Sequence, residues 1–379
     1  MRVVYWGTYD TGKPRTRILM RGLKENSIQV LECHGDVWGD IEDKSQVPGW
    51  LQKLRLVVRW FSSYPGLVVR YMRLPRHDLV ITGYLGQLDV LVLWPFARLR
   101  GVPIVWDAFL SLYNTVVEDR KWIGPNHPLA FLLFAWEYLS CRAADLVILD
   151  TRAHADYFEQ RFKIPEARIG VVFVGVETDA FPLRPQSVEM RKPNQPLRVL
   201  FYGQFIPLQG IETIIRAAQR TEDQPIQWVI IGTGQEGSKI RDMINRHPLS
   251  RLQWIPWVPY RELAEWIHRS DICLGIFGDS DKASRVIPNK VFQILSTGTP
   301  VITRDSPAIR ELLSPGIPGV YLIPAMDDSS LVKALTDFSI RRHLLFAQVL
   351  HRDVVEHIEP RAIGSKVVEV LNRLRIIGS

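Results

Sequence analysis

The 379-residue sequence is too long for one ordinary hydrophobic core, so we expect two domains of roughly 150 to 200 residues each. Hydrophobic residues make up 46% of the chain, enough for two cores, and the net charge of +7 favours anionic partners such as nucleotides, lipid phosphates or nucleic acid. The three cysteines, Cys33, Cys141 and Cys273, have neither paired nor metal-ligand spacing. They exclude a disulfide framework and fit a reducing cytosol.

No secretory or membrane-spanning segment is expected. The N-terminus, MRVVYW, is typical of a strand and not of the charged region that opens a signal peptide. The most apolar stretches, 79–99 and 129–149, are interrupted by Asp89, Glu137 and Asp145. Neither reaches the roughly 18 uninterrupted apolar residues that a membrane-spanning helix needs.

Short apolar strands alternate with segments of helical period along the chain. Examples are RVVYW, DLVITG, VPIVWD and DLVILD in residues 1–183, and LRVLFYG, IQWVIIG, DICLGIF and TPVITR in residues 197–358. The alternation predicts an α/β protein with two Rossmann-like, doubly wound domains and an active site in a cleft at the carboxyl ends of the strands. Residues 184–196 are the expected linker, and residues 359–379 are expected to form a helix that packs back on the N-terminal domain.

The loop after the first strand, Gly7-Thr-Tyr-Asp-Thr-Gly12-Lys13, has the spacing of a phosphate-binding P-loop. The next residue is Pro14 in place of the Ser or Thr that would hold magnesium, so a nucleoside triphosphatase is not expected. Pro14 suits the first turn of a helix, and the loop amides would be available to an anion.

Residues 50–76 interleave basic side chains with Trp and Leu and contain no acid. The basic residues are Lys53, Arg55, Arg59, Arg70, Arg73 and Arg76. This pattern is typical of a helix that lies on an anionic membrane surface. The alternative is a helix whose apolar face packs into its own domain and whose arginines are solvated. Nucleic acid is not an expected partner, because no recognised nucleic-acid module accompanies the charge.

Asp107 ends the strand VPIVWD, where its carboxylate is expected to face the active site. There it would orient a hydroxyl of the acceptor or of the donor sugar, with Ser111, Tyr113 and Asn114 lining the site. The alternative role for Asp107 is a helix N-cap. His154 is expected on a turn or a helix surface and not in catalysis.

Two motifs in the second domain match ligand sites only in part. Gly232-Thr-Gly234-Gln-Glu-Gly237 follows a strand as a dinucleotide fingerprint does, but no acid for a ribose follows about twenty residues later. A tight strand-to-helix turn is the alternative to a dehydrogenase site. Asp279-Ser-Asp281 resembles a metal–nucleotide site without further ligands, so we expect a solvated loop and no metal, while a contact to a polar substrate stays open.

Three segments of the second domain, read together, resemble the nucleotide-sugar domain of retaining glycosyltransferases of the glycosyltransferase family four type (group 1). They are LFYGQFIPLQGIETIIRAA, WVIIGTGQE and RVIPNKVFQILSTGTPVITRD. The first domain resembles the family more weakly, through YWGTYDTGKPRTRILMRGL. The resemblance implies the GT-B fold, in which two Rossmann-like domains face a cleft. It also implies acceptor-side positions for Gly7, Thr8, Tyr9, Asp10, Arg15 and Tyr113.

The donor-binding residues of the family are only partly present. The resemblance implies donor-binding turns at Gly203, Gly210, Gly232 and Gly234. The family usually holds the donor diphosphate with an arginine and a lysine, and it usually has two glutamates, separated by seven residues, on the donor sugar and the ribose. The matching positions here are Gln204 and Gln209 for the cations, and Arg285 and Gln293 for the acids. These departures leave open a non-catalytic partner subunit that binds a nucleotide sugar.

The changes at these positions are not random, because Arg285 and Lys290 bring two cations to where the departing diphosphate would lie. Pro288 would fix the first turn of a helix and leave the amides near Asn289 and Lys290 to face the phosphates. A Pro-Asn-Lys opening is similar to one branch of the family. Gln293 lies on the same helix face and would bind ribose hydroxyls. The alternatives are a solvated Lys290 and a helix-surface Gln293.

The sequence therefore predicts a cytoplasmic glycosyltransferase of the hexosyltransferase type that moves a sugar from a nucleotide-sugar donor to an acceptor hydroxyl. Retention of configuration is implied by the resemblance, and no metal or cofactor is expected. Lys290 and Arg285 would stabilise the leaving diphosphate, with Asp107 on the side of the reacting sugar. The expected acceptor is a lipid-linked or cell-surface glycan of polysaccharide biosynthesis, reached at the inner face of the plasma membrane through residues 50–76. A nucleic-acid-binding protein is the further alternative.

Overall fold

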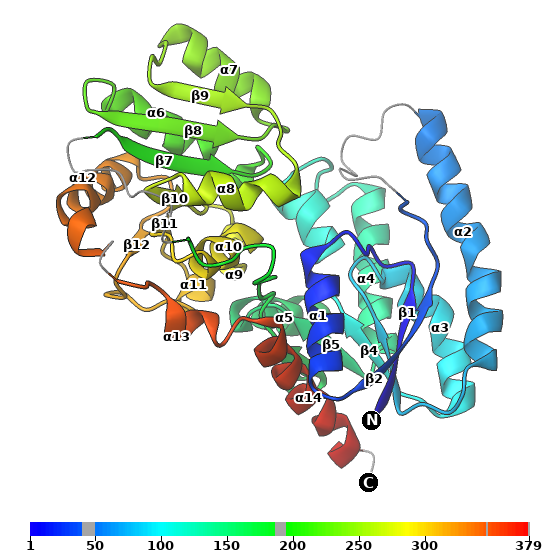
Figure 1. Ribbon diagram of the computed structural model, residues 1–379. Coiled ribbons are helices and arrows are strands. Elements are labelled where there is room, and N and C mark those ends of the chain that lie inside the picture. The colour runs from blue at the N-terminus through cyan, green and yellow to red at the C-terminus, as the bar shows by residue number, and fades with distance from the viewer. Residues whose placement is uncertain (40–49, 186–194, 346–347, 378–379) are drawn as a thin grey trace. The chain divides into compact units, whose positions relative to one another are not determined.

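The computed structural model describes residues 1–39, 50–185, 195–345 and 348–377 (Figure 1). It consists of two compact units, one formed by Met1–Val174 with Pro360–Ser379 and the other by Gly175–Glu359. Each unit contains a six-stranded sheet, and the strand pairs are parallel. The prediction of two doubly wound α/β domains is confirmed. The expected linker, 184–196, falls mainly on residues 186–194, outside the described ranges, and residues 175–183 lie with the second unit.

The first sheet has the strand order β2-β1-β3-β4-β5-β6. Its strands are β1 (Arg2–Gly7), β2 (Gln29–His34), β3 (Leu79–Thr82), β4 (Ile104–Asp107), β5 (Leu146–Leu149) and β6 (Ile169–Val171). Along β1, Val4 and Trp6 pack into the core on one face of the sheet, and Val3 and Tyr5 pack into the core on the other. Because helices cover both faces, the buried strands are apolar along nearly their whole length.

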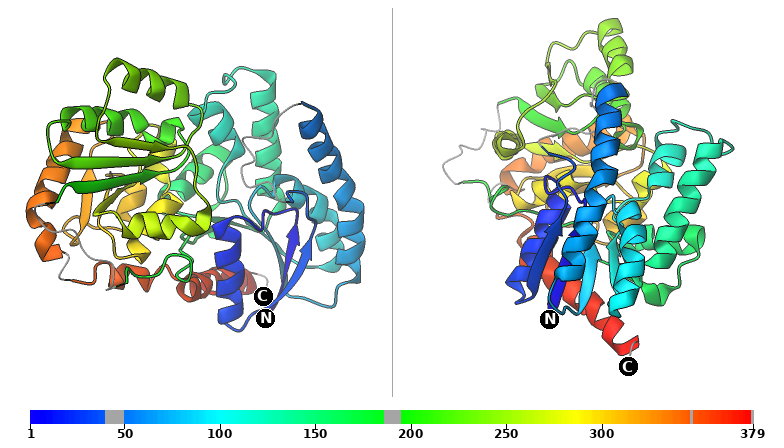
Figure 2. Two further views of the ribbon diagram at one scale, coloured as in Figure 1. Left: turned by 45° about the horizontal axis from the view of Figure 1, so that its top comes forward. Right: turned by 90° about the vertical axis from the view of Figure 1, so that its right-hand side faces the viewer.

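Helices of the first unit cover both faces of its sheet (Figures 1 and 2). On one face lie α2 (Trp50–Arg73), α3 (Gln87–Arg100), α4 (Pro128–Ala143) and α5 (Arg152–Phe162), and on the other lie α1 (Pro14–Glu25) and α14 (Pro360–Ile377). Short helices η2 (Asn114–Asp119) and η3 (Glu166–Arg168) connect strands. The helices α1 and α14 touch through their backbones, because a Cβ on Gly364 would lie 2.1 Å from the carbonyl oxygen of Gly22. The last helix of the chain thus belongs to the first unit.

The second sheet has the order β12-β11-β10-β7-β8-β9. Its strands are β7 (Leu197–Tyr202), β8 (Ile226–Ile231), β9 (Leu252–Ile255), β10 (Ile272–Leu274), β11 (Val301–Arg304) and β12 (Val320–Ile323). Its helices are α6 (Ile211–Arg220), α7 (Gly237–Arg246), α8 (Leu263–His268), α9 (Asp281–Arg285), α10 (Asn289–Ser296), α11 (Pro307–Arg310), α12 (Asp328–Leu345) and α13 (Arg352–Val355), with short turns η4 (Pro207–Gln209) and η5 (Tyr260–Glu262). Residues of α6, α7 and α12 form one core with β7 and β8.

The order in which the chain adds strands to the second sheet reverses between β7 and β10, although the two strands are parallel. From β7 the chain proceeds outward through β8 and β9, then returns to β10 on the other side of β7. Open parallel sheets bind ligands beyond the carboxyl ends of the strands at such a switch point. The residues that follow these two strands, Gly203 and Gly275, therefore mark where a ligand is expected in this unit.

Cys33, Cys141 and Cys273 are buried free thiols. In the part of the chain that the structure describes, no helix combines the length and the hydropathy needed to cross a bilayer.

Candidate functional site

The turns after β7 and β8 pack directly on each other because they contain glycine. Gly232 has a φ of +144°, and a Cβ at this position would lie 1.9 Å from the carbonyl oxygen of Gly203. At Gly234 a Cβ would lie 2.8 Å from both the backbone nitrogen and the carbonyl oxygen of Phe205. This close approach accounts for the Gly-x-Gly spacing that resembles a dinucleotide fingerprint. It agrees with the alternative interpretation of the motif as a tight strand-to-helix turn.

Lys290 lies at the switch point of the second sheet and is only 5% exposed. Its Nζ donates to Oε1 of Gln209 at 2.6 Å and to the carbonyl oxygen of Gly275 at 3.3 Å, and lies 3.7 Å from the ring centroid of Phe201. A Cβ on Gly203 would be 3.0 Å from the same nitrogen, so Gly203 leaves room for the amine. The alternative of a solvated lysine is wrong.

The contacts of Lys290 do not neutralise its charge. The partners of its Nζ are a side-chain amide, a carbonyl oxygen and an aromatic face. Burial lowers the pKa of Lys290 well below its ordinary value. Because desolvation disfavours the ammonium form, a negative partner at this position would raise the pKa again. Lys290 therefore offers a buried amine that an anion beside it would return to the charged form.

The next turn of α10 carries Gln293, whose Oε1 accepts a hydrogen bond from the Tyr202 hydroxyl at 2.9 Å. Its Nε2 lies 3.4 Å from the hydroxyl of Tyr260. Gln293 is 6% exposed, so the helix-surface alternative is wrong. Pro288 is the extended N-cap residue of α10, one position earlier than a first-turn proline, and Asn289 begins the helix. No side chain of the described residues caps this N-terminus, and uncapped helix amides of this kind are the groups that bind anions in proteins.

The other predicted donor-site residues lie on neighbouring elements of the second unit. Arg285 ends α9, and its Nη2 lies 3.1 Å from Oδ2 of Asp281 in an ion pair. Gln204 is exposed on the turn after β7. Gly210, with a φ of +63°, joins η4 to α6. Among the described residues, no group of three or more His, Cys, Asp and Glu side chains has an arrangement that could hold a metal.

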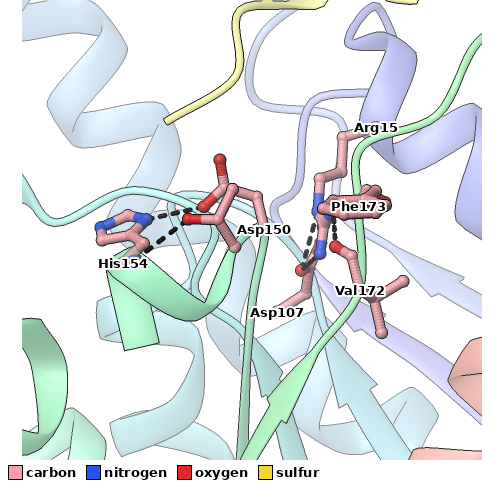
Figure 3. Close-up of polar contacts among 7 residues, drawn as sticks. Arg15, Asp107, Asp150, His154, Val172 and Phe173 are labelled. Carbon is pink, nitrogen blue, oxygen red and sulfur yellow. Dashed lines mark hydrogen bonds and ion pairs between the residues drawn. The ribbon is translucent and has the colours of Figure 1, made fainter. Parts of the chain in front are cut away.

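In the first unit, Arg15 and Asp107 form a buried ion pair at the carboxyl edge of the sheet (Figure 3). Arg15 Nη2 lies 2.6 Å from Oδ1 of Asp107, and Nε donates to both carboxylate oxygens, at 2.9 and 3.1 Å. Nη1 donates to the carbonyl oxygens of Val172 and Phe173. Burial opposes the charge of Arg15, but the Asp107 carboxylate outweighs it and raises the pKa of Arg15. The alternative of an N-cap is wrong, because η2 begins only at Asn114, with Tyr113 as its N-cap.

A second pair, which sequence reasoning missed, is formed by Asp150, directly after the neighbouring strand β5, and His154 of α5 (Figure 3). The Nδ1 of His154 lies 2.7 Å from Oδ1 of Asp150, and both side chains are 2% exposed. The expectation that His154 lies on a turn or a helix surface is therefore wrong, because its side chain is buried. Within the described chain, Oδ2 of Asp150 is buried without a hydrogen-bond partner. The available signal was the strand DLVILD, which ends in an acid as VPIVWD does.

The loop after β1 is organised by acidic side chains. The backbone nitrogen and Oγ1 of Thr8 donate to Asp89 at 2.8 and 3.0 Å, and the Gly12 nitrogen donates to Oδ1 of Asp10 at 2.9 Å. These two amides are thus occupied by the carboxylates of the protein itself, contrary to the expectation that the loop amides are available to an anion. Pro14 begins α1, as predicted. Burial raises the pKa of Asp89 to about 6.

The remaining acceptor-side residues lie in the same unit. A Cβ on Gly7 would lie 2.2 Å from Oδ2 of Asp89, and the ring of Tyr9 packs edge-on against Tyr5 with centroids 4.6 Å apart. Residues 111–114 are held by Glu137, which accepts from the Ser111 hydroxyl at 2.6 Å and from the backbone nitrogens of Leu112 and Tyr113. The buried Glu137 therefore organises Ser111 and Tyr113, a role that the sequence did not predict.

Two family models match this chain. Residues 196–339 match the model described as glycosyl transferases group 1, and residues 15–175 match the glycosyl transferase 4-like domain. WcaI of Escherichia coli (strain K12), named for glycosyl transfer in colanic acid biosynthesis, is 28% identical over 186 residues, 48% of this chain and 44% of WcaI. The amylovoran biosynthesis glycosyltransferase AmsK of Erwinia amylovora is 24% identical over 179 residues, 46% of this chain and 43% of AmsK. The matches thus span less than half the length of these two relatives.

Solved structures match over the whole chain and identify the fold as GT-B. Sucrose-phosphate synthase from Thermosynechococcus elongatus matches with a TM-score of 0.70 at 15% identity and covers 100% of both chains. Anabaena HepE in complex with UDP-glucose matches with a TM-score of 0.68 at 14% identity and covers 98% of this chain and 99% of HepE. HepE has also been solved in complex with UDP.

Proposed function

Because this chain belongs to the glycosyltransferase group 1 family and has the GT-B fold, we propose that it transfers a sugar from a nucleotide-sugar donor to a hydroxyl of an acceptor. The donor is a nucleoside diphosphate sugar held by the second unit. Structures of HepE with UDP and UDP-glucose support this class of donor and make UDP-glucose the first compound to try.

The observation that carries the proposal is the buried amine of Lys290 between Gly203 and Gly275, at the switch point of the second sheet. A group that leaves as a nucleoside diphosphate gains negative charge, and a buried cation fixed beside it stabilises that charge more than a cation in water does. Arrival of the diphosphate would restore the charge of Lys290, because an anion raises the pKa that burial has lowered. Lys290 would thus stabilise the diphosphate in place of the family lysine, whose position the resemblance assigns to Gln209.

We propose that transfer retains the anomeric configuration and needs no metal. The bond between the anomeric carbon and the diphosphate oxygen breaks, the acceptor oxygen bonds to the same carbon, and the hydroxyl proton passes to the departing diphosphate. The N-terminal amides of α10 and Arg285 would stabilise the diphosphate together with Lys290. Gln293, fixed by Tyr202, would bind the ribose hydroxyls.

The first unit would hold the acceptor. Both oxygens of Asp107 accept from Arg15, so we propose that this carboxylate is a positioning residue that fixes Arg15 and the edge of the sheet, and that it does not itself touch the sugar. The loop at Gly7–Asp10 and Tyr113 would line the acceptor side. The buried, unpaired Oδ2 of Asp150 adds a hydrogen-bond acceptor at the same edge.

The acceptor that we propose is a lipid-linked or cell-surface glycan, used by the enzyme in the cytoplasm at the inner face of the plasma membrane. The names of WcaI and AmsK, which refer to colanic acid and amylovoran biosynthesis, support a polysaccharide product. Another relative, 22% identical over 250 residues, is named chitobiosyldiphosphodolichol beta-mannosyltransferase, after a lipid-linked acceptor. The proposal is tested by transfer of label from the donor to a lipid-diphosphate-linked sugar.

The decisive first experiment is a thermal-shift screen against a panel of nucleotide sugars, followed by a donor-hydrolysis assay with each compound that binds. A ligand that binds only the native state raises the melting temperature. Binding with slow release of free nucleotide diphosphate supports the transferase. Binding without hydrolysis or transfer would identify a non-catalytic partner subunit. Indifference to nucleotide sugars combined with steeply salt-dependent affinity for DNA or RNA would identify a nucleic-acid-binding protein.

A further inference from the structure

The outer surface of the helical layer α2–α4 carries most of the exposed large hydrophobic side chains in the described chain. Twelve residues of these three helices have exposed fractions between 39% and 77%. They are Leu54, Val57, Val58, Phe61, Val69 and Met72 of α2, Trp94 and Leu99 of α3, and Leu129, Phe131, Leu132 and Leu139 of α4. Exposed apolar side chains are ordinary when they are scattered, but a set gathered on one layer of helices marks an interaction surface. We call these twelve residues the α2–α4 surface.

Helix α2 has two separate apolar rows. Tyr64, Leu67 and Tyr71 follow the spacing of three and four residues and are buried against the sheet. A second row, which includes Val58, Phe61 and the other exposed residues of α2, faces away from that core. The helix therefore packs into its own unit with one row and still presents the other. Packing alone, the alternative raised from the sequence, accounts for only the first row.

The exposed charged side chains of α2, α3 and α4 are basic, and one of them, Arg59, forms an ion pair 3.6 Å long with the exposed Asp36 that follows β2. Four exposed arginines flank the exposed apolar row of α2, because each directly follows a residue of that row in the sequence. They are Arg55, Arg59, Arg70 and Arg73. The sequence of α2 contains no acidic residue, and the only acids of α3 and α4 are Asp89 and Glu137, each 1% exposed. Basic side chains beside apolar ones suit a partner that is negatively charged at its surface and apolar beneath it.

Helix α4 carries a row of exposed apolar side chains of its own. Leu129, Leu132 and Leu139 are spaced three and seven residues apart and lie on one face of α4. The rings of Trp60 and Trp136 connect α2 with α4, and their centroids lie 6.4 Å apart. The second view in Figure 2 shows these helices of the first unit from the side. The surface is therefore broader than the basic segment 50–76.

We propose that the α2–α4 surface binds the interface of an anionic lipid bilayer, with its apolar side chains among the acyl chains and its arginines at the lipid phosphates. A second copy of this chain is a poorer occupant, because pairing two such surfaces brings their arginines together while the helices α2, α3 and α4 carry no exposed carboxylate of their own. The inference rests on exposed side chains and charge, and not on the transfer chemistry proposed above.

The test is sedimentation of the full chain with vesicles of phosphatidylglycerol and phosphatidylcholine, compared with vesicles of phosphatidylcholine alone. The wild type is expected to bind the anionic vesicles and to bind the neutral ones much less. Neutralising two exposed arginines, Arg55→Gln with Arg73→Gln, is expected to weaken binding to anionic vesicles about thirtyfold. Replacing two exposed rings, Phe61→Ser with Phe131→Ser, is expected to weaken it at least as much.

The matched control is Ile340→Ser with Leu344→Ser on α12, whose side chains are 69% and 58% exposed, close to the 70% of Phe131 and the 56% of Phe61. This variant should bind vesicles as the wild type does. Melting temperatures near the wild-type value show that each variant is folded. The proposal is overturned if the wild type ignores anionic vesicles, if neither double variant loses binding, or if Phe61→Ser with Phe131→Ser only converts a dimer to a monomer. Because no donor is present, these results do not depend on whether the chain transfers sugar.

Discussion

The Nζ of Lys290 donates to the Oε1 of Gln209 at 2.6 Å, so the buried amine lies beside the residue that the resemblance places at the position of the family lysine. The two positions are far apart in sequence, on α10 and at the end of η4. Their contact supports the hypothesis that the positive charge is supplied by another element of the chain at the same place in the fold.

Replacing Lys290 by methionine should lower turnover about 100-fold or more, because a buried group that stabilises the leaving charge is removed. The melting temperature should not fall, since methionine fills a similar volume without burying a charge. Steady-state kinetics and thermal unfolding measure the two effects. The control is Lys333→Met at an exposed position of α12, which should change neither. Turnover at the wild-type level in Lys290→Met would remove this residue from the mechanism.

The glycines after β8 should differ sharply in their tolerance of alanine. In Gly232→Ala the new Cβ would lie 1.9 Å from a backbone oxygen, and we expect the free energy of unfolding to fall by about 3 kcal/mol or more. In Gly237→Ala the nearest atom lies 3.7 Å away, and the helix position gains from alanine, so the change should be within about 1 kcal/mol. Urea unfolding of the two variants provides the measurement. Equal losses would mean that the spacing does not serve a close backbone contact.

The Arg15–Asp107 pair should be strongly coupled. Arg15→Met or Asp107→Leu should each lower the free energy of unfolding by about 3–5 kcal/mol, because each leaves a buried charge without its partner. The double variant Arg15→Met with Asp107→Leu should lose less than the sum. Urea unfolding of the three variants measures the coupling.

The exposed pair Arg21 and Glu25 on the same helix provides the matched comparison, with side chains 43% and 35% exposed. Arg21→Met should change the free energy of unfolding by less than about 1 kcal/mol. Additive losses at Arg15 and Asp107, as for two independent sites, would refute the coupling.

Acid should destabilise the second unit through His351. This residue is 6% exposed, its Nε2 lies 3.1 Å from the carbonyl oxygen of Thr299, and burial lowers its pKa to about 4. Between this value and the ordinary 6.5 the unfolded chain binds more protons, so stability falls as the pH is lowered through this range. At pH 5 the loss relative to pH 7 should be about 2 kcal/mol from this residue.

His351→Asn should remove that dependence, since asparagine does not titrate and tolerates the left-handed backbone at φ +64°. The same substitution at the exposed His343 should leave it in place. Urea unfolding at pH 5 and pH 7 compares the three proteins. An unchanged difference between the two pH values in His351→Asn would show that another group is responsible.

The sequence predicted the elements that depend on local pattern. The apolar strands with polar ends predicted both parallel sheets, and Pro14 predicted the start of α1, because these features follow from periodicity and backbone preference. The resemblance related Lys290 to Gln209 through a cation that had moved, without predicting that the two side chains touch. Their contact could not be predicted, since it depends on the rotamer of one side chain across two strands.

The partners of buried charges were the least predictable features. Asp107 was expected to face a hydroxyl, but tertiary packing brings Arg15 of α1 to both of its oxygens. Glu137 interrupts an apolar stretch and was used only to exclude a membrane span, although it holds residues 111–114. A lone acid in an apolar helix requires a buried partner, and that rule was the available signal.

The central claim, that Lys290 contacts the diphosphate of a nucleotide-sugar donor, is tested most directly by titrating UDP-glucose, and then the other nucleotide sugars of the panel, into the wild type and Lys290→Met by calorimetry. We predict that at least one nucleotide sugar binds the wild type and that the substitution weakens its binding at least tenfold, while the variant keeps the wild-type melting temperature without ligand. Equal affinity of the two proteins for every nucleotide sugar that binds, or no binding of any of them to the wild type, would contradict the claim.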